Sequence, residues 1–557
     1  MLIRALQKQL ECLYDALGIY KMAFKQGNNK VVSANGLCIP DIRVSSSTPK
    51  KKRGEGHDNV SRMVNDNGQD VIYYPQNLDI RHYRNGDPLI TGSWDTFASS
   101  TEGAFLITGD GPGGTGGGIY KHQHINQEIY GLHYNFWAVM DLRGIAPMGW
   151  HIDCSDMLRS PNAEVGFRKS PLTAYSFMDP SQKGWANIDE TTLRNEATTH
   201  MLAAGSMEAF TGSPDDKIRE TAFIWSGRYP NAQPAAIEGG IYTFNYDDSV
   251  VEHNLYNPST GASLRPRKDP PAVDIDGNRY ETITVQGRFG AGNKVINQCW
   301  TIENHRGIRF NDGTDIMIAA HQDHTDLWLN DGNHTVRRPM ATYCTTKALC
   351  ISEDPASNLY SDFDYRQSIN DYGLLYNGWA VNPAYNGGKT LAPTAADPGW
   401  RMPTKDDYTL LKEYVDDTYT LNHIPTASPT FAQTLVMKDK VHRTLAESDL
   451  GWTDVDGISE APIMTTGHAD NWGVGDLGFC ATMSGGRTWD TGAHFSDGFH
   501  VWMADSSSDE LWAGRVTNHD GTDFPIDPFE VAAGNGMQSG FSIRFVYDLP
   551  YGEGVYL

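Results

Sequence analysis

The sequence predicts an α+β protein, built from two consecutive copies of one domain behind a short N-terminal helix. Three observations predict this class. Similar blocks of residues occur twice in the same order, runs of strand and helix type occur within the copies, and long stretches rich in Gly, Asn, Asp and Ser separate these runs. A chain of 557 residues is also long enough for more than one domain. We expect a helix at 1–24, a linker at 25–60, and domains at 61–269 and 270–557.

The first 24 residues carry apolar side chains at heptad spacing. The positions are Ile3, Leu6, Leu10, Leu13 and Leu17. About two and a half heptads are too short to form a stable helix alone in water. Two interpretations remain open: the helix packs on its own domain, or it forms an oligomeric coil or a docking peg. For the coil we take a homotrimer as the working state. The basic run Lys50–Arg53 follows in a Ser- and Pro-rich stretch and is typical of a solvated linker.

The internal repeat consists of matching blocks at similar spacing. A Pro-rich break at residues 267–271 separates the two copies. Repeated blocks in one order predict repeated domains. The pairs are 130–139 with 372–381, 146–152 with 398–402, 77–88 with 303–314, and 261–265 with 540–544.

Secondary structure within the copies is mixed. Thr404 to Val415 has helical spacing, with acidic residues near its start. The runs Ile241 to Tyr246 and Phe541 to Tyr547 alternate and predict strands. We expect short strands that carry long loops, and such loops usually carry function.

Composition excludes some classes of function. The formal net charge of −24 argues against nucleic acid as a partner, because phosphate binding needs a positive surface. The 14 Trp and 26 Tyr residues favour a binding surface made of aromatic rings. Residues 1–21 lack the apolar core of a signal peptide, and no stretch is apolar enough to span a membrane. We therefore expect synthesis in a cytosol and no membrane insertion.

The cysteines predict no disulfide framework. Their number is odd, at seven, and no CxxC spacing occurs. A pair of Cys344 with Cys350 remains an alternative to free, buried thiols. Free thiols fit a reducing cytosol.

The second copy resembles the Fibrobacter major-paralogous-domain family, a branch of the C-type-lectin-like fold common in Bacteroidetes and their phages. The resemblance covers nearly the whole copy, and it is the combination of motifs that is specific. The motifs are DGNRY at 276–280, a 295–304 stretch that ends in Glu-Asn, YGLLYN at 372–377, GWRMPT at 399–404, GGR at 485–487, the aromatic and Ser-rich run at 501–512, and GFSIR at 540–544.

The resemblance implies two tandem C-type-lectin-like domains and a ligand surface near the C-terminus. Relatives include proteins whose C-terminal strand and loops vary to bind new partners. The equivalent surface residues here are Phe499, His500, Trp502, Asp505, Ser506, Trp512, Arg515, Asn518, His519 and Asp523. Aromatic faces beside polar tips suit sugars or protein surfaces. The alternative for Trp502 and Trp512 is a place in the core.

The first copy departs from the family pattern. Residues 152–156 replace its Pro-Thr motif, Ala262 and Pro266 stand where the family has Phe and an apolar residue, and residues 104–118 include an unusual Gly-rich loop. The resemblance therefore implies the same fold for the first copy but does not imply a ligand site there. We therefore expect the first copy to serve assembly and the second to face a ligand.

Catalytic and metal chemistry find little support. The Gly-rich run 109–118 lacks the Gly-Lys-Ser/Thr ending of a phosphate loop. The pairs His122 with His124 and His321 with His324 lack further ligands at diagnostic spacing. Residues 274–278 look like half a calcium loop but predict a turn. Formylglycine-generating enzymes share the broad fold, yet Cys480 has no nearby partner cysteine. We expect no cofactor, no metal and no enzymatic activity.

These observations together predict a phage virion protein, such as a fibre or decoration subunit, that attaches to a bacterial surface glycan or protein. It would be made in the host cytoplasm, act in the virion, contact other virion proteins and form a homo-oligomer. Several heads on one oligomer would give avidity for dense surface glycans. Two alternatives stay open: a structural virion component without a host ligand, and a bacterial cell-surface adhesin.

Overall fold

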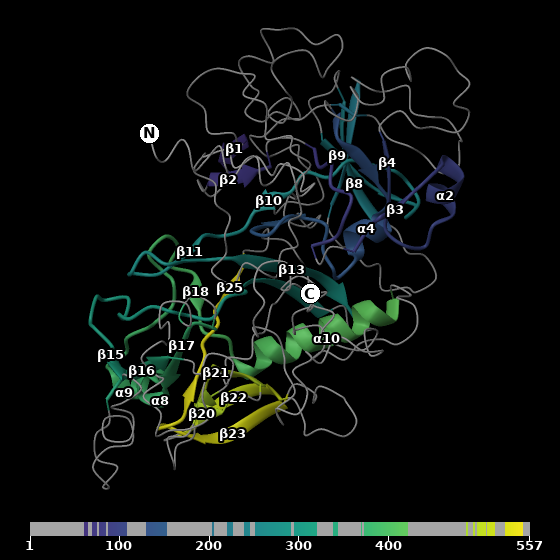
Figure 1. Ribbon diagram of the computed structural model, residues 1–557. Coiled ribbons are helices and arrows are strands. Elements are labelled where there is room, and N and C mark those ends of the chain that lie inside the picture. The colour runs from purple at the N-terminus through teal and green to yellow at the C-terminus, as the bar shows by residue number, and fades with distance from the viewer. Residues whose placement is uncertain are drawn as a thin grey trace, which may run out of the picture. The chain divides into compact units, whose positions relative to one another are not determined.

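The structure is a computed structural model of the chain (Figure 1). The chain divides into two compact units, Met1–Ala34 and Asn35–Leu557, and every described residue belongs to the second. The helix and linker predicted for residues 1–60, with Ile3, Leu6, Leu10, Leu13 and Leu17, therefore lie outside the described residues. The structure describes residues 61–64, 70–74, 77–84, 87–107, 130–152, 203–204, 220–226, 239–245, 251–290, 294–319, 338–343, 369, 372–421, 486–487, 494–495, 498–507, 510–517 and 530–549.

The described chain is a mixed α and β structure with several small sheets and few helices, so the α+β class predicted from the sequence is confirmed in broad terms. We refer to residues 61–269 as the first half and to residues 270–557 as the second half. No helix of the described residues is both long and apolar enough to cross a membrane.

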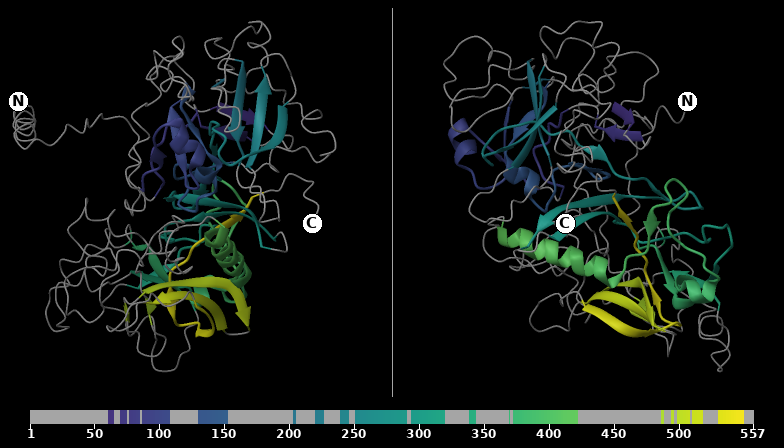
Figure 2. Two further views of the ribbon diagram at one scale, coloured as in Figure 1. Left: turned by 90° about the vertical axis from the view of Figure 1, so that its right-hand side faces the viewer. Right: turned by 180° about the vertical axis from the view of Figure 1, so that it is seen from behind.

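The first half contains three sheets and two described helices (Figures 1 and 2). One sheet has the order β1 (Ser61–Val64), β2 (Asp70–Tyr73), β10 (Arg267–Lys268), β6 (Trp150–His151). The next has the order β3 (Ile90–Thr91), β4 (Ala104–Ile107), β5 (Leu132–Tyr134), with β3 and β4 parallel. The third is the antiparallel sheet β7 (Thr221–Trp225), β8 (Gly239–Asn245), β9 (Val251–Tyr256). The helices are α2 (Trp94–Ser99) and α4 (Phe136–Met140).

The described part of the second half contains three larger sheets and one two-stranded sheet. One has the order β13 (Thr282–Phe289), β14 (Lys294–Thr301), β25 (Val546–Asp548), β18 (Trp400–Arg401). Another has the order β15 (Met317–Ala319), β16 (Met340–Tyr343), β17 (Leu374–Asn377), β24 (Gly540–Phe541), β19 (Gly486–Arg487), β20 (His494–Phe495), with β15 and β16 parallel. The third is β21 (Gly498–Ser507), β22 (Glu510–Thr517), β23 (Glu530–Gly536). The remaining elements are β11 (Ala272–Val273), β12 (Arg279–Tyr280), α8 (Gly378–Val381), α9 (Pro383–Asn386) and α10 (Lys405–Leu421).

Asn135 organises the centre of the first half. Its side chain is fully buried and caps α4. Its Oδ1 accepts hydrogen bonds from the backbone N–H groups of Ala104, at 2.9 Å, and Ala138, at 3.1 Å. Its Nδ2 donates to the carbonyl of Glu102 at 2.8 Å. One amide therefore joins the start of β4 to the first turn of the helix after β5.

Asn377 makes the same three bonds in the second half. It is also fully buried and caps α8. Its Oδ1 accepts from the backbone N–H groups of Met340 and Ala380, and its Nδ2 donates to the carbonyl of Arg338, all at 3.0 Å. Asn135 and Asn377 stand at the same position of the repeated sequence block, so the repeat in sequence coincides with a repeat of contacts.

A buried tryptophan closes each half in the same way. Trp225 Nε1 donates to the carbonyl of Tyr134 at 2.6 Å, and Trp502 Nε1 donates to the carbonyl of Tyr376 at 2.7 Å. Both tryptophans are at most 1% exposed. Each indole thus ties the three-stranded sheet of its half to the strand before the capped helix.

Each half has its own apolar core. The core of the first half draws its residues from Leu78 to Leu264, and the core of the second half draws its residues from Ala272 to Leu549. A smaller cluster around Trp94 and Phe97 packs beside α2. Burial of apolar area in two separate clusters provides the main stabilising free energy of each half.

Helix α10 matches the helix predicted from residue 404 onwards and extends to Leu421. Thr404 and Asp407 bond to each other's backbone N–H groups as a capping box. Tyr408, Leu411 and Val415 lie on one face and are buried. In Figures 1 and 2 the helix lies between β13 and the sheet β21–β23.

The strand predictions are confirmed in one place and corrected in another. Residues 241–245 of the predicted run lie in β8, and Tyr246 lies outside the described residues. The run 541–547 is not one strand, because β24 ends at Phe541 and β25 starts at Val546. Its backbone crosses between two sheets: the N–H of Ser542 donates to the carbonyl of His500, and the N–H of Phe545 donates to Thr301 Oγ1.

Candidate functional site

The predicted ligand surface falls on the hairpin β21–β22, which contains a β-bulge. Trp502 pairs with Ala513 and Ser506 pairs with Leu511. Three residues, 503–505, therefore lie opposite the single residue Trp512. Bulges bend a strand and redirect its side chains, and they are common next to functional sites.

The bulge presents Trp512 together with two polar residues. Trp512 is half-buried, and the ammonium group of exposed Lys405 lies over its ring, 4.5 Å from the centroid. The carboxylate of Asp505, also half-buried, accepts a hydrogen bond from the backbone N–H of Lys405 at 2.5 Å. The result is an aromatic face beside a cation and a carboxylate. We refer to Lys405, Asp505 and Trp512 as the Trp512 surface.

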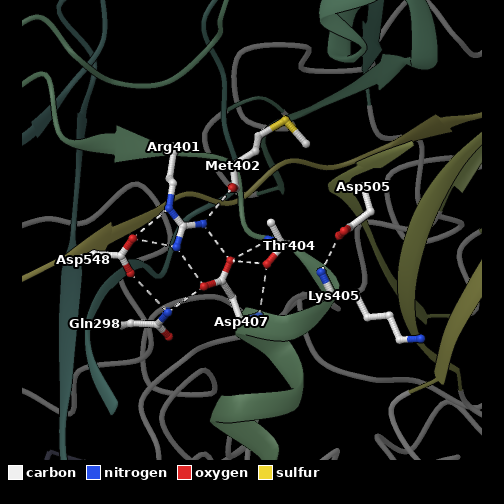
Figure 3. Close-up of polar contacts among 8 residues, drawn as sticks. All are labelled: Gln298, Arg401, Met402, Thr404, Lys405, Asp407, Asp505 and Asp548. Atoms are coloured by element: carbon white, nitrogen blue, oxygen red, sulfur yellow. Dashed lines mark hydrogen bonds and ion pairs between the residues drawn. The ribbon is translucent and has the colours of Figure 1, made fainter. Parts of the chain in front are cut away.

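The start of α10 holds this surface in place (Figure 3). The backbone N–H of Ala504 in the bulge donates to the carbonyl of Pro403 at 2.8 Å. Together with the bond from Lys405 to Asp505, this contact fastens the bulge to the first turn of the helix. The GWRMPT motif therefore contacts the bulge through the carbonyl of Pro403.

An ion-pair network surrounds Asp407 in the first turn of α10 (Figure 3). The guanidinium of Arg401 binds both carboxylate oxygens of Asp407, at 2.6 and 2.8 Å, and its Nε donates to Asp548 at 2.8 Å. Asp407 also accepts from Gln298 Nε2 at 2.6 Å and from the hydroxyl of Thr404 at 2.7 Å. A bidentate arginine fixes geometry as well as charge.

Burial and charge act in opposite directions on Asp407. Burial raises its pKa, but hydrogen bonds from Arg401 and Thr404 and the charge of Arg401 outweigh burial, so the pKa lies below its usual value. The hydrogen bond to Asp407 raises the pKa of Arg401, although burial opposes this. Both groups are therefore charged at neutral pH, and their ion pair stabilises the first turn of α10.

Three of the predicted surface residues belong to the interior instead. Phe499 and Trp502 are 0% exposed and His500 is 6% exposed. Both faces of β21 are covered here: Phe499 lies against Arg544, while His500 and Trp502 pack on the ring of Phe541. The prediction that these three side chains face a ligand is therefore corrected. For Trp502 the core alternative holds.

The other predicted residues are placed in part. Asp505 and Trp512 contribute to the Trp512 surface. Ser506 and Arg515 lie in β21 and β22, but their side chains are outside what the structure describes. The remaining three, Asn518, His519 and Asp523, lie outside the described residues altogether.

Lys405 was missed by sequence reasoning. Its position directly after the Pro-Thr pair could have indicated it. A residue in the first turn of α10 lies close to any segment that packs on the start of the helix. In the described part of the first half, Trp225 pairs with Ile241, and buried Gly240 occupies the position that corresponds to Trp512. Residues 227–238, which would carry the counterpart of the bulge, lie outside the described residues.

The residues considered for metal binding form structural contacts. Asp274 accepts from Asn278 and from the hydroxyl of Tyr280, and Asp276 pairs with Arg309, so the segment is the predicted turn. Among the described residues, no group of three or more His, Cys, Asp or Glu side chains is placed to hold a metal ion. His122, His124, His321, His324 and the Gly-rich run 109–118 lie outside the described residues.

Cys299 is a free thiol in the core, where burial raises its pKa. The other six cysteines, Cys344 and Cys350 among them, lie outside the described residues. A buried thiol with a raised pKa is a poor nucleophile. Cys299 therefore acts as a packing residue.

No protein-family model matches the chain, and neither the curated proteins nor the solved structures contain a match to it.

Proposed function

We propose that the protein is a phage virion protein, a fibre or decoration subunit, that recognises a bacterial surface glycan or protein through two C-type-lectin-like domains. In this proposal residues 61–269 and 270–557 are the two domains. The repeated contacts of Asn135 and Asn377 support a common fold for them, since each amide makes the same three bonds.

The observation that carries the binding role is the Trp512 surface. A half-exposed indole can stack on the C–H face of a sugar, or pack on an apolar patch of a protein. Lys405 and Asp505 stand beside it as donor and acceptor for hydroxyl or amide groups. The ion-pair network at the helix start braces the turn that carries Lys405, and a preorganised surface lowers the entropy cost of binding.

The two halves have different roles in this proposal. The second half has Trp512 beside the bulge, while the first half has Gly240 at the position that corresponds to Trp512. The second half therefore binds the ligand, and the first half contributes to assembly with other virion proteins. Oligomerisation through residues 1–24 multiplies the binding sites and gives avidity on a dense surface.

Two measurements on the purified full chain test this function. Mass photometry gives the oligomeric state, and labelled protein is then incubated with intact Bacteroidetes cells. A discrete oligomer that decorates the cells supports the proposal and leads to a glycan screen. An oligomer that leaves all tested cells bare contradicts the attachment role and favours a purely structural virion component.

A further inference from the structure

A cavity of about 80 Å³ lies where the first and second halves meet. Residues 139–142, 144–146 and 150–152 line one side, while residues 284–286 of β13 and Tyr414 of α10 line another. A single water needs roughly 10–15 Å³ on the same measure. The cavity therefore has room for several waters or for one small polyatomic ion.

Arg84 lines this cavity without a hydrogen-bonded carboxylate among the described residues, and the charge of Asp269 opposes the effect of burial on its pKa only in part. The residue is 8% exposed, and its backbone N–H donates to the carbonyl of Gly144. Among the described residues, the guanidinium has one hydrogen-bond partner, the weak acceptor Met148 Sδ at 4.0 Å, and its Nε has none. Burial lowers the pKa of Arg84 to about 10, so the side chain remains protonated at neutral pH.

The carboxylates near the cavity are already bound by other groups. Asp141 receives two hydrogen bonds from Arg143, at 2.9 and 2.7 Å. Asp269 receives bonds from His151, at 2.7 Å, and from two threonine hydroxyls of β13. Neither forms an ion pair with Arg84. A buried charge without a partner is costly, which favours an anion that enters from solvent.

We propose that this cavity binds a small oxyanion, of the size and charge of hydrogen phosphate or a single carboxylate group, through Arg84. The planar guanidinium matches two oxygens of such an anion. Gln286 also lines the cavity, and its Oε1 has no hydrogen-bond partner among the described residues. This oxygen accepts a hydrogen bond from an anion that carries a hydroxyl, which favours hydrogen phosphate over sulfate.

Arg84 has no arginine counterpart in the repeat. By its backbone contacts Arg84 corresponds to Asn311, because the N–H of Arg84 donates to the carbonyl of Gly144 and the N–H of Asn311 donates to the carbonyl of Thr390. This register differs by one residue from the predicted pairing of 77–88 with 303–314, and Asn311 is exposed. Because the lining comes from both halves, a bound anion joins them and stabilises their junction. This inference is independent of the role of Trp512.

The test is a titration of the full chain with sodium phosphate, sulfate, acetate and chloride at equal ionic strength. Thermal unfolding and calorimetry are the readouts. We expect a saturable rise in Tm that is largest with phosphate, smaller with acetate and sulfate, and absent with chloride. Phosphate above acetate identifies the hydroxyl-bearing anion, and acetate above phosphate identifies a carboxylate. Equal shifts in all four salts overturn the proposal.

Variants locate the binding at the cavity. Arg84→Met should weaken phosphate binding at least tenfold, while Arg81→Met removes the same charge from an exposed position nearby and should leave binding unchanged. Should Arg84→Met fail to fold, hydrogen exchange on the wild-type chain gives the same answer. Phosphate should then protect residues 139–152 and 282–289 together. Protection elsewhere, or unchanged binding in Arg84→Met, refutes the site.

Discussion

Replacing Asn377 by Ala should destabilise the second half strongly. The substitution removes three hydrogen bonds, all at 3.0 Å, and leaves two backbone N–H groups and one carbonyl without their partner. Each buried polar group left unsatisfied costs about 1–3 kcal/mol. Some relaxation and water entry will reduce the sum, so we expect a loss of about 3–5 kcal/mol in the free energy of unfolding. Asn135→Ala should have a similar effect in the first half.

The assay is chemical denaturation of the full chain, followed by tryptophan fluorescence and circular dichroism. Because the two halves have separate cores, Asn377→Ala should lower the midpoint for the second half and Asn135→Ala the midpoint for the first. Asn311→Ala, at an exposed position, is the matched control and should change stability by less than about 0.5 kcal/mol. A loss in Asn377→Ala as small as in this control would refute the reasoning.

Three further predictions concern charged and titrating groups. Burial lowers the pKa of His305 to about 4, so between pH 6.5 and 4 the imidazole is protonated in the unfolded chain but neutral in the folded one. The free energy of unfolding should therefore fall by up to about 3 kcal/mol as pH drops from 6.5 to 4. In denaturation curves measured over this pH range, His305→Gln should show a smaller fall. Burial and neighbouring Glu303 raise the pKa of Glu281 to about 8. The stabilisation from its protonated form is therefore fully present below pH 4.5 and lost as pH rises to 8. Glu281→Gln should raise the free energy of unfolding by about 1–3 kcal/mol at pH 8, with a higher Tm, and should leave stability unchanged at pH 4.5. Asp407 has a lowered pKa, so its stabilisation is present above pH 3.8 and is lost as pH falls further. Asp407→Asn should cost about 2–3 kcal/mol at pH 7 and progressively less as pH falls below 3.8, and a cost that does not change with pH would contradict the ion-pair account.

The repeat and the long helix were accessible from the sequence. Residues 404–415 show apolar spacing of 3–4, and the pattern survives in the structure because one face of α10 packs on β13 and β14, with Tyr408 against Trp300 and Tyr414 against Phe289. The repeated Asn135 and Asn377 were visible as matching letters. Their three hydrogen bonds were not, because the bonded partners lie on strands that are distant in sequence.

The exposure of individual aromatic residues was not accessible. The alternation of side chains along a strand predicts which of Trp502 and Trp512 points into the core only where the strands pair regularly. The bulge at residues 503–505 interrupts that pairing. Trp502 is fully buried and Trp512 is half-buried. Arg84 gave no signal either. It lies in a polar stretch, and the residues that bury it come from 139–152 and from β13.

The most direct test of the central claim is binding of labelled Trp512→Ala protein to cells that the wild-type protein decorates. Ile308→Ala, which removes another exposed apolar side chain of the second half, is the control. If the Trp512 surface binds the ligand, Trp512→Ala should lose at least about 2 kcal/mol of binding free energy per site, or about 30-fold in affinity, with oligomeric state and Tm unchanged. Ile308→Ala should bind as the wild type does. Equal binding by all three proteins would contradict the claim that this surface recognises the host.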